Sequence, residues 1–216
     1  MKKVKLNLGS GPVGIPGWIN FDSGILPWLS KKPKLRKFIC DIGLLPKNYD
    51  VRWPEIQLVD IRKRFPLDDN SVDYIYCSQV LEHFERYEAV NVLREAYRVL
   101  KSNGVIRISI PSIEKMIKVY QKNLIKSPGT AARDMNITWW GYEKDIAPSN
   151  TFLKLSRLFI RDHQWQYDKN SMKQLLLEAG FKGIKFYSFR KGTIPDLNKL
   201  EIELHSPHSM YVEARK

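Results

Sequence analysis

Hydrophobic and polar positions follow two different periods along this chain. Short apolar or alternating runs bounded by glycine, proline and Asx residues predict strands, whereas apolar residues spaced three and four apart predict helices. We expect strands at residues 4–8, 18–22, 57–60, 72–78, 105–110, 181–189 and 209–214. We expect helices over residues 84–100 and 113–124, and a last one from a cap at Asn170 or Ser171 to Ala179. Strands alternating with helices are typical of an α/β fold with a mainly parallel sheet.

The first predicted strand ends at a glycine turn. Residues 5–12 read Lys-Leu-Asn-Leu-Gly-Ser-Gly-Pro, and a Gly-x-Gly turn lets the backbone bend sharply and leaves N–H groups facing outward. A tight turn without any ligand needs the same residues. The second predicted strand ends at Asp22, where a carboxylate suits a pair of ribose hydroxyls. The remaining segments must decide between a cofactor site and a simple turn.

Five ordered segments carry a resemblance to a known family. They are LNLGSG at 6–11, GWINFD at 17–22, LVD at 58–60, DNSVDYIYCSQVLEH at 69–83 and EAYRVLKSNGVIRISIP at 95–111. In this order and spacing the chain resembles the class I S-adenosylmethionine-dependent methyltransferases. More narrowly, it resembles the small bacterial and archaeal methyltransferase-domain proteins of type 11. The resemblance is close over about residues 3–112 and looser over 163–214.

This resemblance implies a fold, a cofactor and a set of binding residues. The implied fold is a Rossmann-like three-layer α/β sandwich on a mainly parallel seven-stranded sheet, whose last strand inserts antiparallel between the fifth and sixth. The implied cofactor is S-adenosyl-L-methionine, with S-adenosyl-L-homocysteine as product. The implied cofactor-binding residues are Asn7, Leu8, Gly9, Ser10, Gly11, Asp22, Asp60, Ile61, Cys77, Ser78 and His83.

Some of these positions carry a more detailed expectation. By the resemblance, Asp60 would bond the adenine amino group and Ile61 would cover the ring, although Asp60 could equally begin a turn. Asn7 stands where the family often has an acidic residue, and Val13 stands where it has a third glycine. These two departures from the family pattern bear on how tightly the chain would bind the cofactor.

Methyl transfer from a sulfonium depends mainly on holding donor and acceptor aligned, so it needs few catalytic groups. His83 follows the fourth predicted strand at the sheet edge where open α/β folds keep ligands, and its ordinary pKa suits a general base. It could instead begin a helix or pack against the methionine end of the cofactor. His163, in a His-x-Trp-x-Tyr-Asp run also found in similar proteins, is a second catalytic candidate, with a structural role as the alternative.

No metal is expected from the sequence pattern. His205 and His208 resemble a ligand pair, but no third ligand stands at a suitable spacing. The chain has two cysteines, Cys40 and Cys77, and Cys77 falls in a predicted buried strand. We therefore expect reduced thiols rather than a disulfide framework.

Charge is the one unusual feature of the composition. The formal net charge is +13, concentrated at residues 2–5, 31–37 and 62–64. This surplus of positive charge favours an anionic acceptor, which would be a small molecule, a glycan or a lipid-linked precursor. Nucleic acid is a less favoured partner. The alternative is that the basic surface is merely solvated and binds nothing. No apolar run is long enough to span a membrane, so we expect a cytoplasmic protein, with peripheral attachment at the inner membrane surface as an option.

The chain is expected to form a single domain over residues 1–216, with residues 112–162 inserted after the fifth strand. This helical and aromatic insertion is positioned to act as a lid or acceptor-binding subdomain, or else to cover a sheet edge or another subunit. The favoured function is a methyltransferase acting on a small molecule or a cell-envelope glycan or lipid-linked precursor. The alternatives are an RNA or ribonucleoprotein methyltransferase and a non-catalytic S-adenosylmethionine-binding module. The oligomeric state stays open.

Overall fold

The structure, a computed structural model, describes residues 3–45, 47–141 and 162–216. Its centre is a seven-stranded sheet with the order β3-β2-β1-β4-β5-β7-β6. The strands are β1 (Lys5–Leu8), β2 (Ile19–Asp22), β3 (Gln57–Leu58), β4 (Val72–Ser78), β5 (Leu100–Pro111), β6 (Lys182–Tyr187) and β7 (Ser209–Arg215). Neighbours pair in parallel from β3 to β5, and β7 is antiparallel to both β5 and β6. The predicted sheet, including its inserted last strand, is confirmed.

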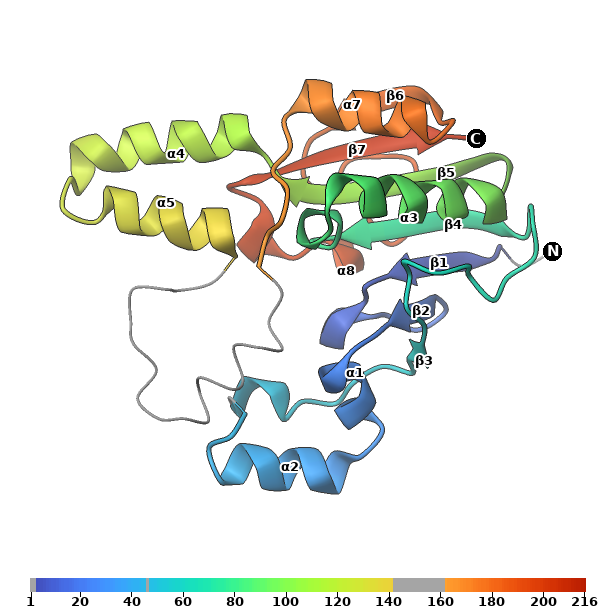
Figure 1. The fold of residues 1–216 in the computed structure, drawn as a ribbon, viewed down its shortest axis with the longest axis horizontal. Helices are drawn as coiled ribbons and strands as arrows, with labels where there is room; N and C mark the ends of the chain where they lie inside the picture. Colours follow the sequence, from blue (N-terminus) through green and yellow to red (C-terminus); the bar gives the residue numbers. More distant parts are fainter. Residues whose placement is uncertain (1–2, 46, 142–161) are drawn as a thin grey trace.

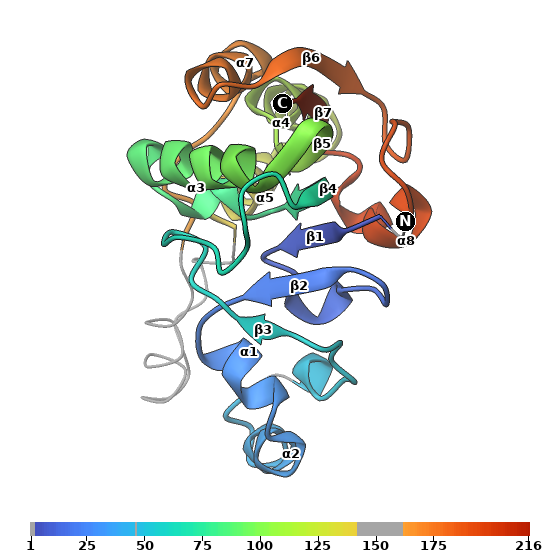
Figure 2. The same ribbon diagram turned by 90° about the vertical axis from the view of Figure 1, so that its right-hand side faces the viewer.

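Helices cover both faces of this sheet. They are α1 (Ile25–Ser30), α2 (Pro33–Asp41), α3 (Arg86–Val99), α4 (Ile113–Lys126), α5 (Ala131–Trp140), α7 (Lys169–Glu178) and α8 (Leu197–Leu200). Figure 2 shows α3 and α7 on one face and α8 on the other, which confirms the three-layer arrangement. Figure 1 shows α4 and α5 running back along each other beyond the sheet, and α1 and α2 beside the β3 edge. No helix among the described residues has the length and apolarity that crossing a bilayer requires.

The core lies on both sides of the central strands. Because successive side chains of a strand point to opposite faces, Ile75 and Cys77 of β4 join the large cluster under α3 and α7, whereas Tyr76 joins a smaller cluster under α8. Burial on both faces explains why the sequence of β4 is nearly continuously apolar rather than alternating.

Several element boundaries differ from the sequence prediction. Helix α7 begins at Lys169 because Asp168 is its N-cap: the Asp168 carboxylate accepts from the Ser171 N–H (2.7 Å), and the Ser171 hydroxyl accepts from the Asp168 N–H (3.0 Å). The expected cap at Asn170 or Ser171 is therefore wrong. Strand β5 begins earlier than expected, at Leu100, since Leu100 pairs with Val72 beyond a register shift.

The inserted segment is partly described. Helix α4 follows the prediction closely, and its N-cap Ser112 accepts from the Lys115 N–H (3.4 Å). The aromatic residues Trp139 and Trp140 end helix α5, and Gly141 terminates it in a left-handed conformation. The amphipathic stretch over residues 152–161 lies outside the described residues. The role of the insertion as a lid or acceptor-binding subdomain stays a prediction.

A buried arginine ties the last quarter of the chain to the sheet. Arg107 lies in the middle of β5 with no solvent exposure. Its guanidinium pairs with the Glu201 carboxylate (2.7 Å) and donates to the Lys191 carbonyl (2.9 Å), with Glu213 of β7 at 3.8 Å. A buried arginine is tolerated only where its donors find such partners. This network therefore fixes the segment leading into α8.

Asp73, beside the start of the chain, gives a testable pH dependence. Burial acts to raise the pKa of Asp73, but bonds from the Lys101 ammonium, the Val4 N–H and the Lys3 ammonium outweigh it and lower the pKa to about 2. An unfolded aspartate has a pKa of about 3.9. The contribution of this carboxylate to stability is therefore complete above about pH 4 and is lost as the pH falls towards 2.

We predict that Asp73→Asn lowers the free energy of unfolding at pH 7 by about 1 to 3 kcal/mol. Urea titrations at decreasing pH should show this deficit shrinking below pH 4. The exposed Asp41, which pairs with Lys37 on the surface of α2, supplies the control, and Asp41→Asn should change little. A deficit that is the same at pH 7 and pH 3 would contradict the assignment.

Candidate functional site

A cavity of about 770 Å³ lies at the carboxyl edge of the parallel strands. Most of its lining comes from segments at or after the ends of the strands: Gly9 and Gly11 after β1, Asp22 at the end of β2, Ile61 after β3 and His83 after β4, with Asp162 and Gln164 completing it. Parallel strands bring their carboxyl ends to one edge, and ligands of open α/β sheets bind there. Its volume is within the range of small-molecule and cofactor sites.

The glycine turn is anchored to the end of β2. The Gly9 and Ser10 N–H groups both donate to the Phe21 carbonyl, at 2.8 and 3.2 Å. Gly9 has a φ of +65°, and a Cβ there would overlap the side chain of Val80. Gly11 has a φ of +51°, but a Cβ there would meet no atom within 4 Å. Gly9 is thus required by packing, whereas the space beside Gly11 is open to a ligand.

Asp22 holds the other end of this turn. One carboxylate oxygen accepts from the Gly11 N–H (2.6 Å) and the other from the Ser23 N–H (2.7 Å). Burial raises the pKa of Asp22, and these two backbone bonds act in the opposite direction. Each carboxylate oxygen accepts more than one hydrogen bond, so Asp22 can also accept from hydroxyls of a ligand in the cavity that it lines.

Asp60, expected to contact adenine, does not line the cavity. Its carboxylate forms a two-pronged pair with the Arg62 guanidinium (2.9 and 2.8 Å), and this bond is the main cause of its lowered pKa. It also accepts from the Arg62 N–H, which is the turn-forming role that the sequence allowed. Arg62 itself lines the cavity, beside Ile61, although its membership of a basic cluster is its only signal in the sequence.

The remaining predicted binding residues divide into two groups. Asn7, Ser10 and Ser78 line a second cavity of about 190 Å³ on the other side of the glycine turn. Leu8 and Cys77 are paired neighbours in the sheet and are buried in the core. Their side chains line neither of these cavities, so any contact with a cofactor would have to come from the backbone.

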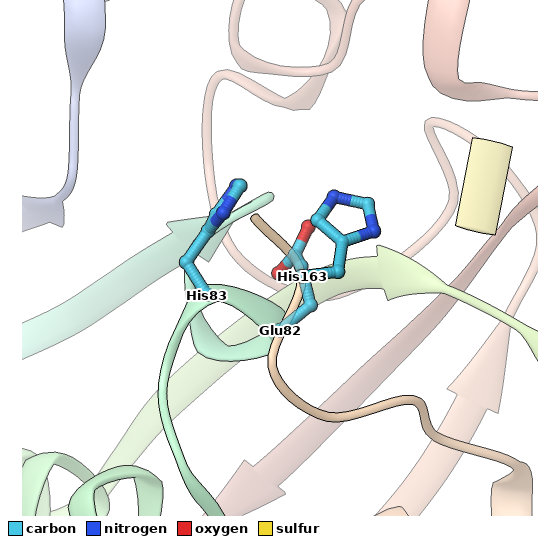
Figure 3. Close-up of side chains that lie close together, drawn as sticks. All are labelled: Glu82, His83 and His163. Atoms are coloured by element: carbon cyan, nitrogen blue, oxygen red, sulfur yellow. The ribbon is translucent and has the colours of Figure 1, made fainter. Parts of the chain in front are cut away.

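The two predicted catalytic histidines lie together. The rings of His83 and His163 are 4.8 Å apart at 72°, and Figure 3 shows both beside the carboxylate of Glu82. The Gln164 and Trp165 N–H groups donate to the Glu82 carbonyl (2.7 and 3.1 Å). These bonds hold the segment that carries His163 against the short turn after β4. Of the two histidines, only His83 lines the cavity.

Glu82 is the residue of this group that the sequence analysis missed. Its position next to His83 was the only signal, and nothing in the pattern distinguishes it from the many exposed glutamates. The side chain is fully buried, and neither carboxylate oxygen has a hydrogen-bond partner among the described residues. Burial raises the pKa of Glu82 to about 8, although the backbone near Glu82 and Val80 acts in the opposite direction.

His163 is held in one tautomer. Its Nδ1 lies 3.0 Å from the Trp139 carbonyl, and because a carbonyl can only accept, Nδ1 carries the proton and Nε2 keeps its lone pair. Burial, and then the neighbouring His83, lowers the pKa of His163 to about 4. His163 is therefore neutral near pH 7. His205 and His208, the other pair considered, have ring centroids 6.0 Å apart, and His205 lines the smaller cavity.

The two glycines of the turn should respond differently to substitution. Gly9→Ala should lower the free energy of unfolding by about 2 to 5 kcal/mol, because it combines a left-handed conformation with overpacking against Val80. Gly11→Ala should cost only about 1 to 2 kcal/mol, since strain acts there without a clash. Equilibrium urea unfolding measures both values, and equal costs would show that Gly9 and Val80 are not in close contact.

Comparison with known proteins agrees with this geometry. A methyltransferase domain family matches residues 44–108. Two uncharacterized Schizosaccharomyces pombe proteins are similar: one, methyltransferase-like, is 34% identical over 94 residues, and the other, a methyltransferase, is 29% identical over 191 residues. These matches cover 38% and 83% of this chain but 36% and 61% of the relatives. The chain thus spans less than two thirds of each curated relative.

Solved structures share the fold. A SAM-dependent methyltransferase from Thermotoga maritima, described as a possible histamine N-methyltransferase, is 15% identical with a TM-score of 0.51, covering 100% of this chain and 83% of that one. A SAM-dependent methyltransferase from Archaeoglobus fulgidus is 16% identical with a TM-score of 0.50, covering 99% and 86%. At such identities the likeness concerns the fold alone. The ordered motifs and the domain match over residues 44–108 agree with this likeness, so the chain is similar to the class I, Rossmann-like S-adenosylmethionine-dependent methyltransferases in both sequence and fold.

Proposed function

We propose that this chain binds S-adenosylmethionine in the 770 Å³ cavity and transfers its methyl group to an acceptor. The observation that carries the proposal is the open space beside Gly11, which faces the carboxylate of Asp22 across the anchored glycine turn. A cofactor seated there would have Asp22 for its ribose hydroxyls and Ile61 for the face of its adenine. S-adenosylmethionine as a cofactor is a property of the family.

Methyl transfer from a sulfonium requires few catalytic groups from the protein. The acceptor atom attacks the methyl carbon, the carbon–sulfur bond breaks with its electrons passing to sulfur, and S-adenosylhomocysteine is left as a neutral thioether. An acceptor that carries a proton must also lose it. His83 is the better-placed base because it lines the cavity, whereas His163, neutral and with a lowered pKa, lies behind it.

The acceptor that we propose is anionic and linked to a lipid. Leu35, Phe38 and Ile42 are exposed, by 40%, 58% and 49%. The three-and-four spacing puts these side chains on one face of α2 and its end. Helix α2 buries Arg36 and Cys40 instead, so its apolar face points outward among lysines. Ile25, at the start of the neighbouring helix α1, lines the cavity. An apolar and basic surface on the helix that follows α1 suits a membrane-borne anion.

The distribution of basic charge favours this acceptor over RNA. Lys3 and Lys5 are paired with Asp73 and Asp196, and Arg62 is paired with Asp60. In the cluster at 31–37, Arg36 pairs with Asp50 and Lys37 with Asp41, but Lys31, Lys32 and Lys34 form no ion pair among the described residues. All three basic clusters are thus partly neutralised, and the three unpaired lysines form a local patch rather than a continuous track for phosphates.

We predict that isothermal titration detects binding of S-adenosylmethionine and S-adenosylhomocysteine to the wild-type protein. Asp22→Asn should weaken both by roughly 10- to 100-fold, the scale of a lost charge-assisted hydrogen bond. Gly11→Val should abolish binding, since its side chain would enter the open space. The control is Asp41→Asn, which removes a carboxylate that does not line the cavity. This variant should bind both ligands as tightly as the wild type does. No heat and no thermal stabilisation of the wild type at millimolar ligand would contradict the proposal.

The lipid-linked acceptor has its own test. Sedimentation with vesicles containing anionic phospholipid should capture the wild type, and zwitterionic vesicles should not. Phe38→Gln should reduce capture several-fold, because it removes an exposed aromatic ring from the apolar face. The matched control is Leu177→Gln on α7, which is similarly exposed, at 51%. Equal loss in both variants, or binding to RNA that falls steeply with salt while vesicles are ignored, would favour the RNA alternative.

A further inference from the structure

We infer that Glu82, His83 and His163 form a binding site for one divalent transition-metal ion of the zinc type, at the wall of the cavity. Each residue offers one ligand atom, and these three atoms lie within 4.8 Å of one another. Figure 3 shows the carboxylate and the two imidazoles converging from two separate segments of the chain. Two imidazoles and one carboxylate are a donor set that zinc and its first-row neighbours accept, and that magnesium and calcium do not favour.

The spacing is close to what an ion needs. Ligand atoms about 2.1 Å from a zinc ion lie roughly 3.4 Å apart around a tetrahedron. The cluster must therefore close by roughly 1 to 1.5 Å, which small rotations of the two histidine side chains can supply. The backbone needs no such adjustment, because the Gln164 and Trp165 N–H groups already fix the two segments on the Glu82 carbonyl.

Glu82 points to a cation independently of this spacing. The Glu82 carboxylate has no solvent exposure, and neither of its oxygens has a hydrogen-bond partner in the described part of the chain, whereas buried carboxylates are normally paired or bound to a metal. The hydroxyl of Tyr167 is also buried without a partner, and Glu82 contributes to raising its pKa. A direct bond between Tyr167 and Glu82 is therefore the competing explanation, and the experiment below separates the two.

His163 is arranged as metal-binding histidines usually are. Its Nδ1–H is held by the Trp139 carbonyl at 3.0 Å, which leaves Nε2 as the nitrogen with a lone pair. Metal-bound histidines characteristically donate their second N–H to a carbonyl or carboxylate in this way, because the bond fixes the tautomer and the ring orientation. Gly141 lies against the Nε2 edge of this ring: a Cβ there would come within 2.5 Å of Nε2, so a side chain at this position would cover the nitrogen that is to bind the ion.

The site would be reachable from the cavity through His83, which lines it together with Asp162 and Gln164. Three protein ligands leave a fourth position of a tetrahedral ion free. If the proposed methyl transfer is correct, this position would take an oxygen of the acceptor and make its hydroxyl easier to deprotonate, and the ion would then replace His83 in assisting the loss of the proton. The substrate class would then be a hydroxyl-bearing acceptor. This role rests on the proposed function, but the metal site itself does not.

The test is metal binding by the 216-residue chain, freed of any affinity tag and stripped with a chelator. Titration with Zn²⁺ should give one ion per chain, and Co²⁺ should give the visible absorption of a tetrahedral site. Glu82→Gln, which keeps the shape of the side chain, and His163→Gln should each weaken binding at least 100-fold. His205→Gln is the matched control, because it removes a histidine outside the cluster, and Tyr167→Phe should also leave the affinity unchanged.

A measurement on the wild type guards against variants that fold poorly. Zn²⁺ should shift the imidazole NMR signals of two of the four histidines, and the spectrum of His205→Gln should show the same two shifts. Absence of binding, shifts of the His205 and His208 rings instead, or an unchanged affinity in Glu82→Gln would overturn the inference. Titration with S-adenosylmethionine is scored separately. If the protein binds the cofactor but no metal, the proposed function is retained and the metal site is rejected. If it binds metal but no cofactor, the metal site is retained and the proposed function is rejected.

Discussion

The close approach of the Gly9 backbone to the Val80 side chain is the contact on which this structure depends. It joins the turn after β1 to the turn after β4, at a distance that leaves no room for a Cβ. The two strands are central neighbours in the sheet, so their ends set the floor of the cavity. This contact positions the residues on both sides of it. The open space beside Gly11 comes two residues after Gly9, and the short turn that carries Glu82 and His83 comes directly after Val80.

The two faces of the sheet are stabilised in different ways. Beneath α3 and α7 the core is a large apolar cluster that β4 shares with both helices. Beneath α8 the apolar cluster is small, and the buried pair of Arg107 with Glu201 holds the covering segment instead. Such a pair contributes to the specificity of the arrangement as much as to stability, because removal of either partner would leave an uncompensated buried charge. This face also carries the smaller cavity, which Leu200 helps to line.

The two sides of the cavity differ in character. On one side the lining includes Arg62, whose guanidinium is paired with Asp60 outside the lining. On the other side the lining includes His83, and its neighbours Glu82 and His163 lie outside the lining, where burial disfavours their charged forms. The cavity therefore has a charged side chain on one side and an imidazole beside desolvated groups on the other.

The sequence by itself determined the order and type of the strands, the glycine turn and helix α3, because hydrophobic period and turn chemistry are local properties. With the ordered motifs it also identified Gly9, Gly11, Asp22, Ile61 and His83, which the fold does gather around one cavity. Only the tertiary structure decided the burial of Glu82 and the meeting of His83 with His163. Each of these depends on a segment remote in sequence or on the exclusion of water. No local pattern records either, since an isolated carboxylate or imidazole looks the same in the sequence whether it ends in solvent or in the core.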